Sequence, residues 1–176
     1  GIAIFYGEGG ASFSPAIKVA VSEPYSIAAA DVDGDTRSDL VVGTLVDGVS
    51  VFSNLGGRTF QKASTASING YVEALAAIDF DEDDRIEVVA AIAGATSRIL
   101  MYRVGIDGGL TALQEWPYVP GAMDVRACDI NGDARMDFVA VPNESRWVAL
   151  FLNDGRGGVI ETQVATSVGH SRLRVG

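Results

Sequence analysis

Residues 31–42 read DVDGDTRSDLVV, and this segment decides the fold because it occurs three times. It returns as DFDEDDRIEVVA at residues 79–90 and as DINGDARMDFVA at residues 129–140. The first aspartates of the three copies, at positions 31, 79 and 129, are 48 and 50 residues apart. Repetition at a nearly constant interval of this length is typical of proteins in which similar structural units stack on one another.

The sequence on either side of each acidic loop also repeats, and its pattern is that of short β-strands. A short alternating stretch precedes each loop, and an apolar run follows it, such as LVV at residues 40–42. A third strand then ends in a glycine turn and a fourth closes the unit, as in VSVFSNLGG at 49–57 and FQKAS at 60–64. Period-two alternation bounded by Gly, Asn and Asp predicts antiparallel strands. We therefore expect an all-β fold with almost no helix.

Four short strands in a unit of just under 50 residues are the size of one β-propeller blade. We expect the second half of a blade at 1–22, blades with the first, second and third acidic loops at 23–70, 71–120 and 121–168, and the first strand of another blade at 169–176. Closed propellers have about four to eight blades, whereas this array holds about three and a half. We therefore expect the chain to be part of a larger propeller, with a symmetric dimer of two halves as the alternative.

Each acidic loop has oxygen-bearing side chains at loop positions 1, 3, 5 and 9, counted from its first aspartate, and position 7 can offer its backbone carbonyl. Alternate residues of a tight turn can surround one ion with the roughly six to eight oxygen ligands that Ca²⁺ prefers. Without a cation, carboxylates this close would repel one another. The predicted ligands are Asp31, Asp33, Asp35, Arg37 and Asp39 in the first loop, Asp79, Asp81, Asp83, Arg85 and Glu87 in the second, and Asp129, Asn131, Asp133, Arg135 and Asp137 in the third.

Ligand chemistry and charge favour Ca²⁺ over other metals, and the sequence disfavours an EF-hand. Mg²⁺ gives up its water shell reluctantly, and Zn²⁺ prefers Cys or His ligands. An EF-hand needs a glutamate at position 12, where this chain has Val42, Ala90 and Ala140. The three loops contain thirteen of the 23 acidic residues, and three Ca²⁺ ions would change the formal net charge from −10 to −4. The middle loop departs most from the pattern, because Glu82 replaces the loop glycine and Glu87 the last aspartate, and we expect its geometry to shift.

The loop D-x-[DN]-G-D-x-x-x-D, its apolar strand and the N-x-G-G-x-x-F hairpin resemble FG-GAP/VCBS repeats along the whole chain. The resemblance implies a β-propeller, often seven-bladed, as in integrin α-subunits and many secreted proteins, lectins and polysaccharide-active enzymes. It implies Ca²⁺ in the hairpin between the first two strands of a blade, and an extracellular, secreted or cell-surface location. The family often has Gly at loop position 6, where this chain has Thr36, Asp84 and Ala134, so we expect a different loop backbone there.

Composition excludes several classes of function. The excess of 23 acidic over 13 basic residues disfavours nucleic acid and anionic membranes as partners. No apolar run approaches the roughly 18–20 residues of a membrane span. Cys128, the single cysteine, is expected to be a small core residue, and His170, the single histidine, leaves no His-based triad to assemble. We therefore expect no enzymatic activity from this chain.

The leading functional hypothesis is a calcium-stabilised extracellular module for protein–protein interaction, adhesion or structural assembly. The alternatives are a lectin-like propeller that binds glycans and a non-catalytic scaffold within a polysaccharide-active enzyme. Trp116, Tyr118 and Trp147 could stack on sugar rings, but they do not recur at the repeat spacing, so packing is the favoured role. The arginines at loop position 7 are expected to point their guanidinium groups away from the ion and to balance charge, for example by pairing with acids on a neighbouring blade. A partner-binding site is the alternative. Residues 143–145 read NES, a glycosylation sequon at Asn143 in a predicted hairpin loop.

Overall fold

The computed structural model of the chain describes residues 1–117, 122–142 and 147–165. Tyr118, the Asn143 sequon, His170 and the strand expected at 169–176 lie outside these ranges. The described residues form sixteen β-strands and no helix, which confirms the all-β prediction. It follows that they contain no helix long and apolar enough to cross a membrane.

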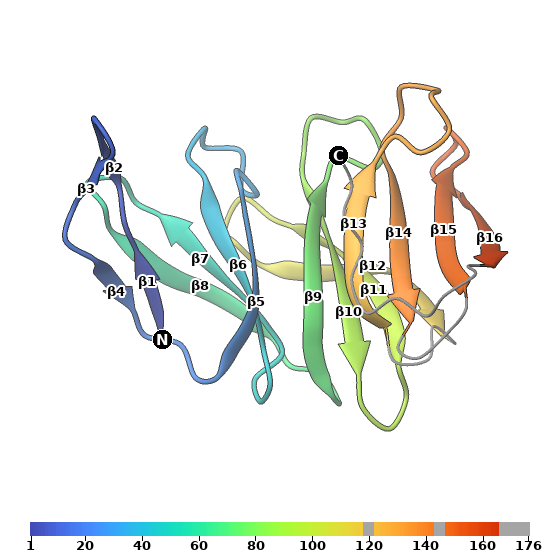
Figure 1. The fold of residues 1–176 in the computed structure, drawn as a ribbon, viewed down its shortest axis with the longest axis horizontal. Helices are drawn as coiled ribbons and strands as arrows, with labels where there is room; N and C mark the ends of the chain where they lie inside the picture. The colour runs from blue at the N-terminus through green and yellow to red at the C-terminus, as the bar shows by residue number, and fades with distance from the viewer. Residues whose placement is uncertain (118–121, 143–146, 166–176) are drawn as a thin grey trace.

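Strands β5 to β16 form three four-stranded antiparallel sheets, each with its strands in sequence order (Figure 1). The first sheet consists of β5 (Pro24–Ala30), β6 (Asp39–Thr44), β7 (Val49–Asn54) and β8 (Phe60–Ala66). The second consists of β9 (Tyr71–Ile78), β10 (Glu87–Ala93), β11 (Arg98–Val104) and β12 (Leu110–Pro117). The third consists of β13 (Ala122–Cys128), β14 (Asp137–Pro142), β15 (Trp147–Asn153) and β16 (Val159–Ala165). Each sheet has the form of a propeller blade, and the described residues do not close a ring.

The N-terminal segment forms two small sheets in place of a full blade. Strand β1 (Ile2–Ile4) pairs with β4 (Ile17–Val19), and the hairpin of β2 (Gly7–Gly9) and β3 (Ser12–Phe13) lies between them in the chain. Residues of β1 and β4 pack against Leu40, Val42 and Phe52 of the first sheet.

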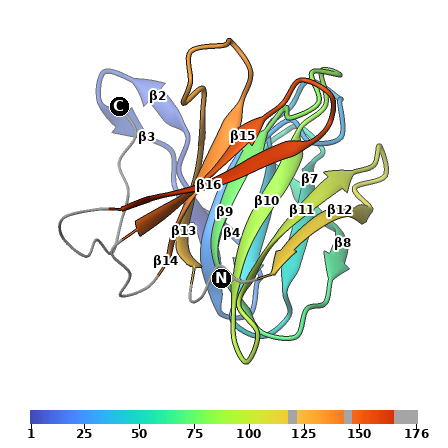
Figure 2. The ribbon, with the colours of Figure 1, turned by 90° about the vertical axis from the view of Figure 1, so that its right-hand side faces the viewer.

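The sheets stack face to face and bury their second strands most deeply. Strands β6, β10 and β14 are buried along their whole length, whereas the fourth strands β12 and β16 are mostly exposed and β8 has no buried residue. One apolar cluster lies between the first and second sheets and a second between the second and third. A strand covered on both faces needs a nearly continuous apolar sequence, which the runs after the acidic loops supply. Figure 2 shows that successive sheets are rotated relative to one another.

Aromatic side chains fill the interface between the second and third sheets. Phe138 and Phe151 stack at a centroid distance of 4.4 Å, and the Trp116 ring meets them edge-on at 5.2 and 5.5 Å. Trp116 is buried, so its packing role is confirmed, and Trp147 packs at the margin of the same cluster. Cys128 is half-buried, in contrast to the buried position expected from the sequence.

The first strand of each sheet has an apolar residue at the same position, and this residue is exposed in the first sheet but buried in the other two. These residues are Ile27, Leu75 and Val125, and each lies opposite the twelfth residue counted from the first aspartate of its acidic loop. Leu75 is 5% exposed and Val125 is 0% exposed because each faces the preceding sheet, but Ile27 is 50% exposed. The outward face of β5 is therefore uncovered at this point.

Candidate metal-binding loops

The three acidic loops connect the first and second strands of their sheets, and they project from the same edge of the molecule, the upper edge in Figure 1. In the first loop, Asp31 organises the turn through backbone hydrogen bonds. Its Oδ1 accepts from the N–H of Gly34 at 2.8 Å and of Asp35 at 3.0 Å, and its Oδ2 accepts from the N–H of Thr36 at 2.7 Å. A carboxylate that accepts several backbone N–H groups fixes the loop around itself.

Asp39, at loop position 9, is fully buried at the start of β6. Its Oδ2 accepts from the N–H of Val32 at 3.1 Å, and its Oδ1 accepts from the N–H of Asn54 on β7 at 2.8 Å. Burial raises the pKa of Asp39, the two N–H groups oppose that rise, and the charges of Asp33 and Asp35 add to it. The buried carboxylate is therefore bound from both sides and also repelled by its neighbours.

The third loop repeats this pattern. Asp129 Oδ1 accepts from the N–H groups of Gly132 and Asp133, and its Oδ2 accepts from that of Ala134. Asp137 accepts from the N–H of Ile130 and of Asn153, both at 2.8 Å. At position 3, Asn131 has its amide directed at Asp133, with Nδ2 donating to Oδ2 at 3.1 Å.

All three loops keep one backbone shape at positions 4 and 6. Glu82 has a φ of 60°, in the same left-handed region as Gly34 at 82° and Gly132 at 79°. At position 6, Thr36, Asp84 and Ala134 have φ values of 72°, 64° and 70°. The middle loop therefore keeps the backbone conformation of the other two at these positions, although its first aspartate accepts one backbone N–H, that of Asp84, where Asp31 and Asp129 each accept three.

Carboxylate oxygens converge in the first and middle loops. Asp31, Asp33 and Asp39 bring ligand atoms within 4.8 Å of one another, and so do Asp79, Asp81 and Glu87. The middle loop is incompletely satisfied: Asp79 Oδ2 accepts from the N–H of Asp84 at 3.2 Å, but its Oδ1 is buried without a hydrogen-bond partner. A buried carboxylate oxygen without a partner is costly, and a cation beside this atom would offset that cost.

The middle loop also contains a residue that sequence reasoning missed. Arg103 on β11 lies directly opposite Glu87 in the strand register. Its Nε donates to Glu87 Oε1 at 3.2 Å, and its Nη2 pairs with Asp81 and lies 3.6 Å from Asp83. Burial raises the pKa of Glu87, and the hydrogen bond to Asp81 raises the pKa of Arg103. The equivalent positions of the first and third sheets hold Ser53 and Leu152. A charged residue at this position in the second sheet alone was the sequence signal that could have identified Arg103.

Two of the arginines at loop position 7 balance charge, as expected, and they do so on acids of their own loops. Arg37 pairs with Asp35 of its own loop, and its Nε donates to the carbonyl of Asn54. Arg135 pairs with Asp133 of its own loop at 3.0 Å and also lies 3.6 Å from Glu82 on the neighbouring sheet. These side chains therefore fold back onto position 5, and one of them links two loops.

A second link joins the third sheet to the middle loop. Asn153 Nδ2 donates to the carbonyl of Phe80 at 2.6 Å, and both residues are buried. Phe80 is loop position 2, and its ring lies 6.3 Å from that of Phe138. The middle loop is thus fastened to the sheet that follows it.

The donor set of these loops fits a hard divalent cation. Carboxylate oxygens converge from positions 1, 3 and 9 in the first and middle loops, and in the middle loop Asp79 Oδ1 is buried without a partner. Such a set suits Ca²⁺ better than metals that prefer nitrogen or sulfur ligands.

Comparison with known protein families supplies one match. A family model described as an FG-GAP-like repeat matches residues 31–90, which span the first loop, the strands from β6 to β9 and the middle loop. No curated protein matches the chain.

Proposed function

Because residues 31–90 form an FG-GAP-like repeat, we propose that the chain is a calcium-stabilised extracellular β-propeller module that mediates protein–protein interaction, adhesion or structural assembly. The observation that carries the proposal is the unpartnered, buried Oδ1 of Asp79 beside the carboxylates of Asp81 and Glu87. A bound Ca²⁺ would complete the coordination of that oxygen and offset the repulsion among the loop carboxylates.

Calcium has a structural role in this proposal. The residues that would hold it are the oxygen-bearing side chains at positions 1, 3, 5 and 9 of each loop, with the carbonyl at position 7. When bound, Ca²⁺ supplies charge neutralisation and a rigid centre and takes part in no reaction. The loop carboxylates are occupied in this way, and the chain is proposed to have no enzymatic activity.

The extracellular location rests on calcium supply. Extracellular calcium modules commonly bind with Kd values of about 10⁻⁴ to 10⁻³ M. Loops that share their carboxylates with Arg37 and Arg135 should bind in this weaker range, because each arginine already neutralises one acid. Such sites fill only where calcium is abundant.

The uncovered face of β5 supports a larger propeller. Ile27 is 50% exposed where its counterparts Leu75 and Val125 are buried by a neighbouring sheet, and Tyr25 is exposed on the same strand. A further blade, supplied by the same or another chain, would cover these side chains as the first sheet covers Leu75. Burial of one such side chain stabilises by about 1.5–3 kcal/mol.

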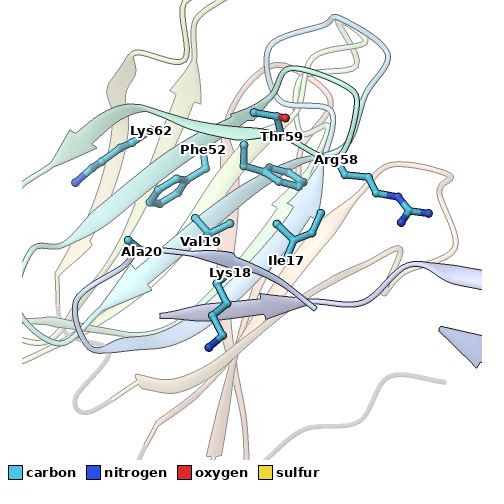
Figure 3. A pocket seen from close by; sticks show the side chains of 9 residues that line it. Ile17, Lys18, Val19, Ala20, Phe52, Arg58, Thr59 and Lys62 are labelled. Carbon is cyan, nitrogen blue, oxygen red and sulfur yellow. The ribbon is translucent and has the colours of Figure 1, made fainter. Parts of the chain in front are cut away.

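The proposed partner is a protein at the propeller surface. A groove of about 470 Å³ lies between β4 and the outer strands of the first sheet (Figure 3). Its floor includes Ile17, Val19 and Phe52, and Arg58 and Lys62 stand at its border. An apolar floor with a basic border suits a protein segment that combines apolar and acidic residues. The burial of Trp116 argues against its use as a sugar-stacking platform.

A thermal melt of the chain in millimolar CaCl₂, MgCl₂ or EGTA tests the proposal. In about 10 mM CaCl₂, Kd values of about 10⁻⁴ to 10⁻³ M mean that each Ca²⁺ adds about 1.4 to 2.7 kcal/mol to the free energy of unfolding, so we expect a calcium-specific rise in Tm. Asp31→Asn should remove part of that rise. Asp47→Asn, which neutralises an exposed carboxylate in the hairpin between β6 and β7, is the matched control and should keep the full rise. Equal melts of the unaltered chain in CaCl₂ and EGTA would refute the calcium role.

A further inference from the structure

The middle loop has the most acidic residues of the three, and an arginine side chain from a neighbouring strand contacts it. Its nine residues include six acids, compared with four in the first loop and three in the third. Arg103 contacts three of the six, at loop positions 3, 5 and 9. The first and third sheets have Ser53 and Leu152 at the equivalent place, so this contact is specific to the loop with the most acids.

Glu87 and Arg103 form a matched pair that replaces a backbone contact. In the first and third loops, the second oxygen of the position-9 aspartate accepts the N–H of Asn54 or Asn153. In the middle loop, Glu87 Oε2 still accepts the N–H of Phe80 at 3.0 Å, but Oε1 accepts from Arg103. At loop position 9, the glutamate therefore accepts a hydrogen bond from a guanidinium group where the two aspartates accept one from a backbone N–H.

We propose that Arg103 is an internal counter-ion that holds the middle loop together in the absence of metal and that competes with calcium for its carboxylates. Calcium then binds the middle loop in exchange for the contacts of Arg103 with Asp81 and Glu87, and this loop is the weakest of the three sites. Arg103 is a positioning residue and is not a metal ligand. The inference rests on the proposed calcium binding of the loops.

Electrostatics gives the direction of two opposite effects. Without calcium, Arg103 neutralises part of a six-acid loop, so its removal leaves the carboxylates to repel one another. With calcium, the guanidinium is a second positive charge within a few ångströms of the ion, so its removal strengthens binding. A residue with a purely structural role would lower stability equally in both conditions.

Calorimetric titration of EGTA-stripped protein with CaCl₂, together with melts in EGTA and in CaCl₂, tests the proposal. Arg103→Leu introduces the residue of the third sheet. We expect it to tighten the weakest calcium site by about tenfold, to lower Tm in EGTA and to enlarge the calcium-induced rise in Tm. Arg103→Lys keeps the charge and should restore most of the Tm in EGTA.

Two further variants complete the design. Arg98→Leu removes a positive charge from the other end of β11, where Arg98 pairs with Glu115 at 3.4 Å, and it should leave all calcium affinities unchanged. Ser53→Arg places an arginine opposite Asp39 and should weaken one of the two tighter sites by about tenfold. Ser53→Arg tests the competition between arginine and calcium even if Arg103→Leu does not fold without calcium.

The outcomes separate the two proposals. In one outcome, the unaltered chain binds calcium, while Arg103→Leu and Ser53→Arg change its affinities by less than about twofold. That result would overturn the counter-ion role and leave the calcium proposal standing. Absence of calcium binding in the unaltered chain and in every variant would overturn the calcium proposal and, with it, the competition.

Discussion

The first and middle repeats share a strand order and a loop backbone, but they stabilise their carboxylates differently. Asp39 in the first repeat accepts two backbone N–H groups, whereas Glu87 in the middle repeat accepts one N–H and the guanidinium of Arg103. The loop φ values agree between the two repeats. Backbone shape is thus set by the repeat as a whole, while charge compensation changes through single side chains on the neighbouring strand.

The two repeats also differ in what covers their first strands. Leu75 packs in the core between the first and second sheets, and the equivalent Ile27 is half exposed. Both side chains are large and apolar, so their different exposure is caused by the presence or absence of a sheet packed against them. An apolar position in a stacked repeat marks a face that needs a partner.

Truncation of these two side chains should give the largest contrast. Leu75→Ala should lower the free energy of unfolding by about 2–4 kcal/mol, because it opens a cavity between two sheets. Ile27→Ala should cost less than about 1 kcal/mol, since half of that side chain already contacts water. Urea unfolding of both variants in CaCl₂ measures the difference. Equal losses would contradict it and would mean that a second copy covers Ile27 in solution, which light scattering would detect.

A glycine at the contact between these two repeats gives the next largest effect. A Cβ on Gly43 would lie 2.4 Å from Val72 Cγ1, and Val72 is fully buried. Gly43→Ala should therefore destabilise the chain by about 1–3 kcal/mol through overpacking. The double variant Gly43→Ala with Val72→Ala should cost less than the sum of the two single variants, as urea unfolding can measure. Additive losses would argue against the close approach.

The smallest expected effect is a gain in stability. Thr36 is β-branched and has a φ of 72° at loop position 6. Thr36→Gly should raise the free energy of unfolding by up to about 1 kcal/mol, because glycine adopts this conformation without a steric cost. Ala134→Gly should gain less, since alanine lacks the branched Cβ. Urea unfolding in CaCl₂ compares the two, and a loss in the Thr36 variant would show that its side chain stabilises the loop.

The sequence was sufficient to predict the strands and the acidic loops, because both depend on local patterns that occur three times. Alternation and turn residues specify four antiparallel strands per repeat. Asp31, Asp33 and Asp39 lie within nine residues of one another, and the loop brings their carboxylates together. A local signal repeated in three places is difficult to misinterpret.

The features that were missed depend on contacts between distant parts of the chain. Arg103 is sixteen residues from Glu87, and only the register of β10 with β11 places the two opposite each other. The exposure of Ile27 depends on the sheet beside it.

The bond from Asn153 to the carbonyl of Phe80 has a consequence for local unfolding. The middle loop cannot open without breaking a buried contact to the third sheet, and the stacked Phe138 and Phe151 lie beside that contact. The equivalent residue of the second sheet is Val104, whose side chain cannot make such a bond to the first loop. We therefore expect the backbone amides of the middle loop to exchange with solvent only when its contact with the third sheet opens.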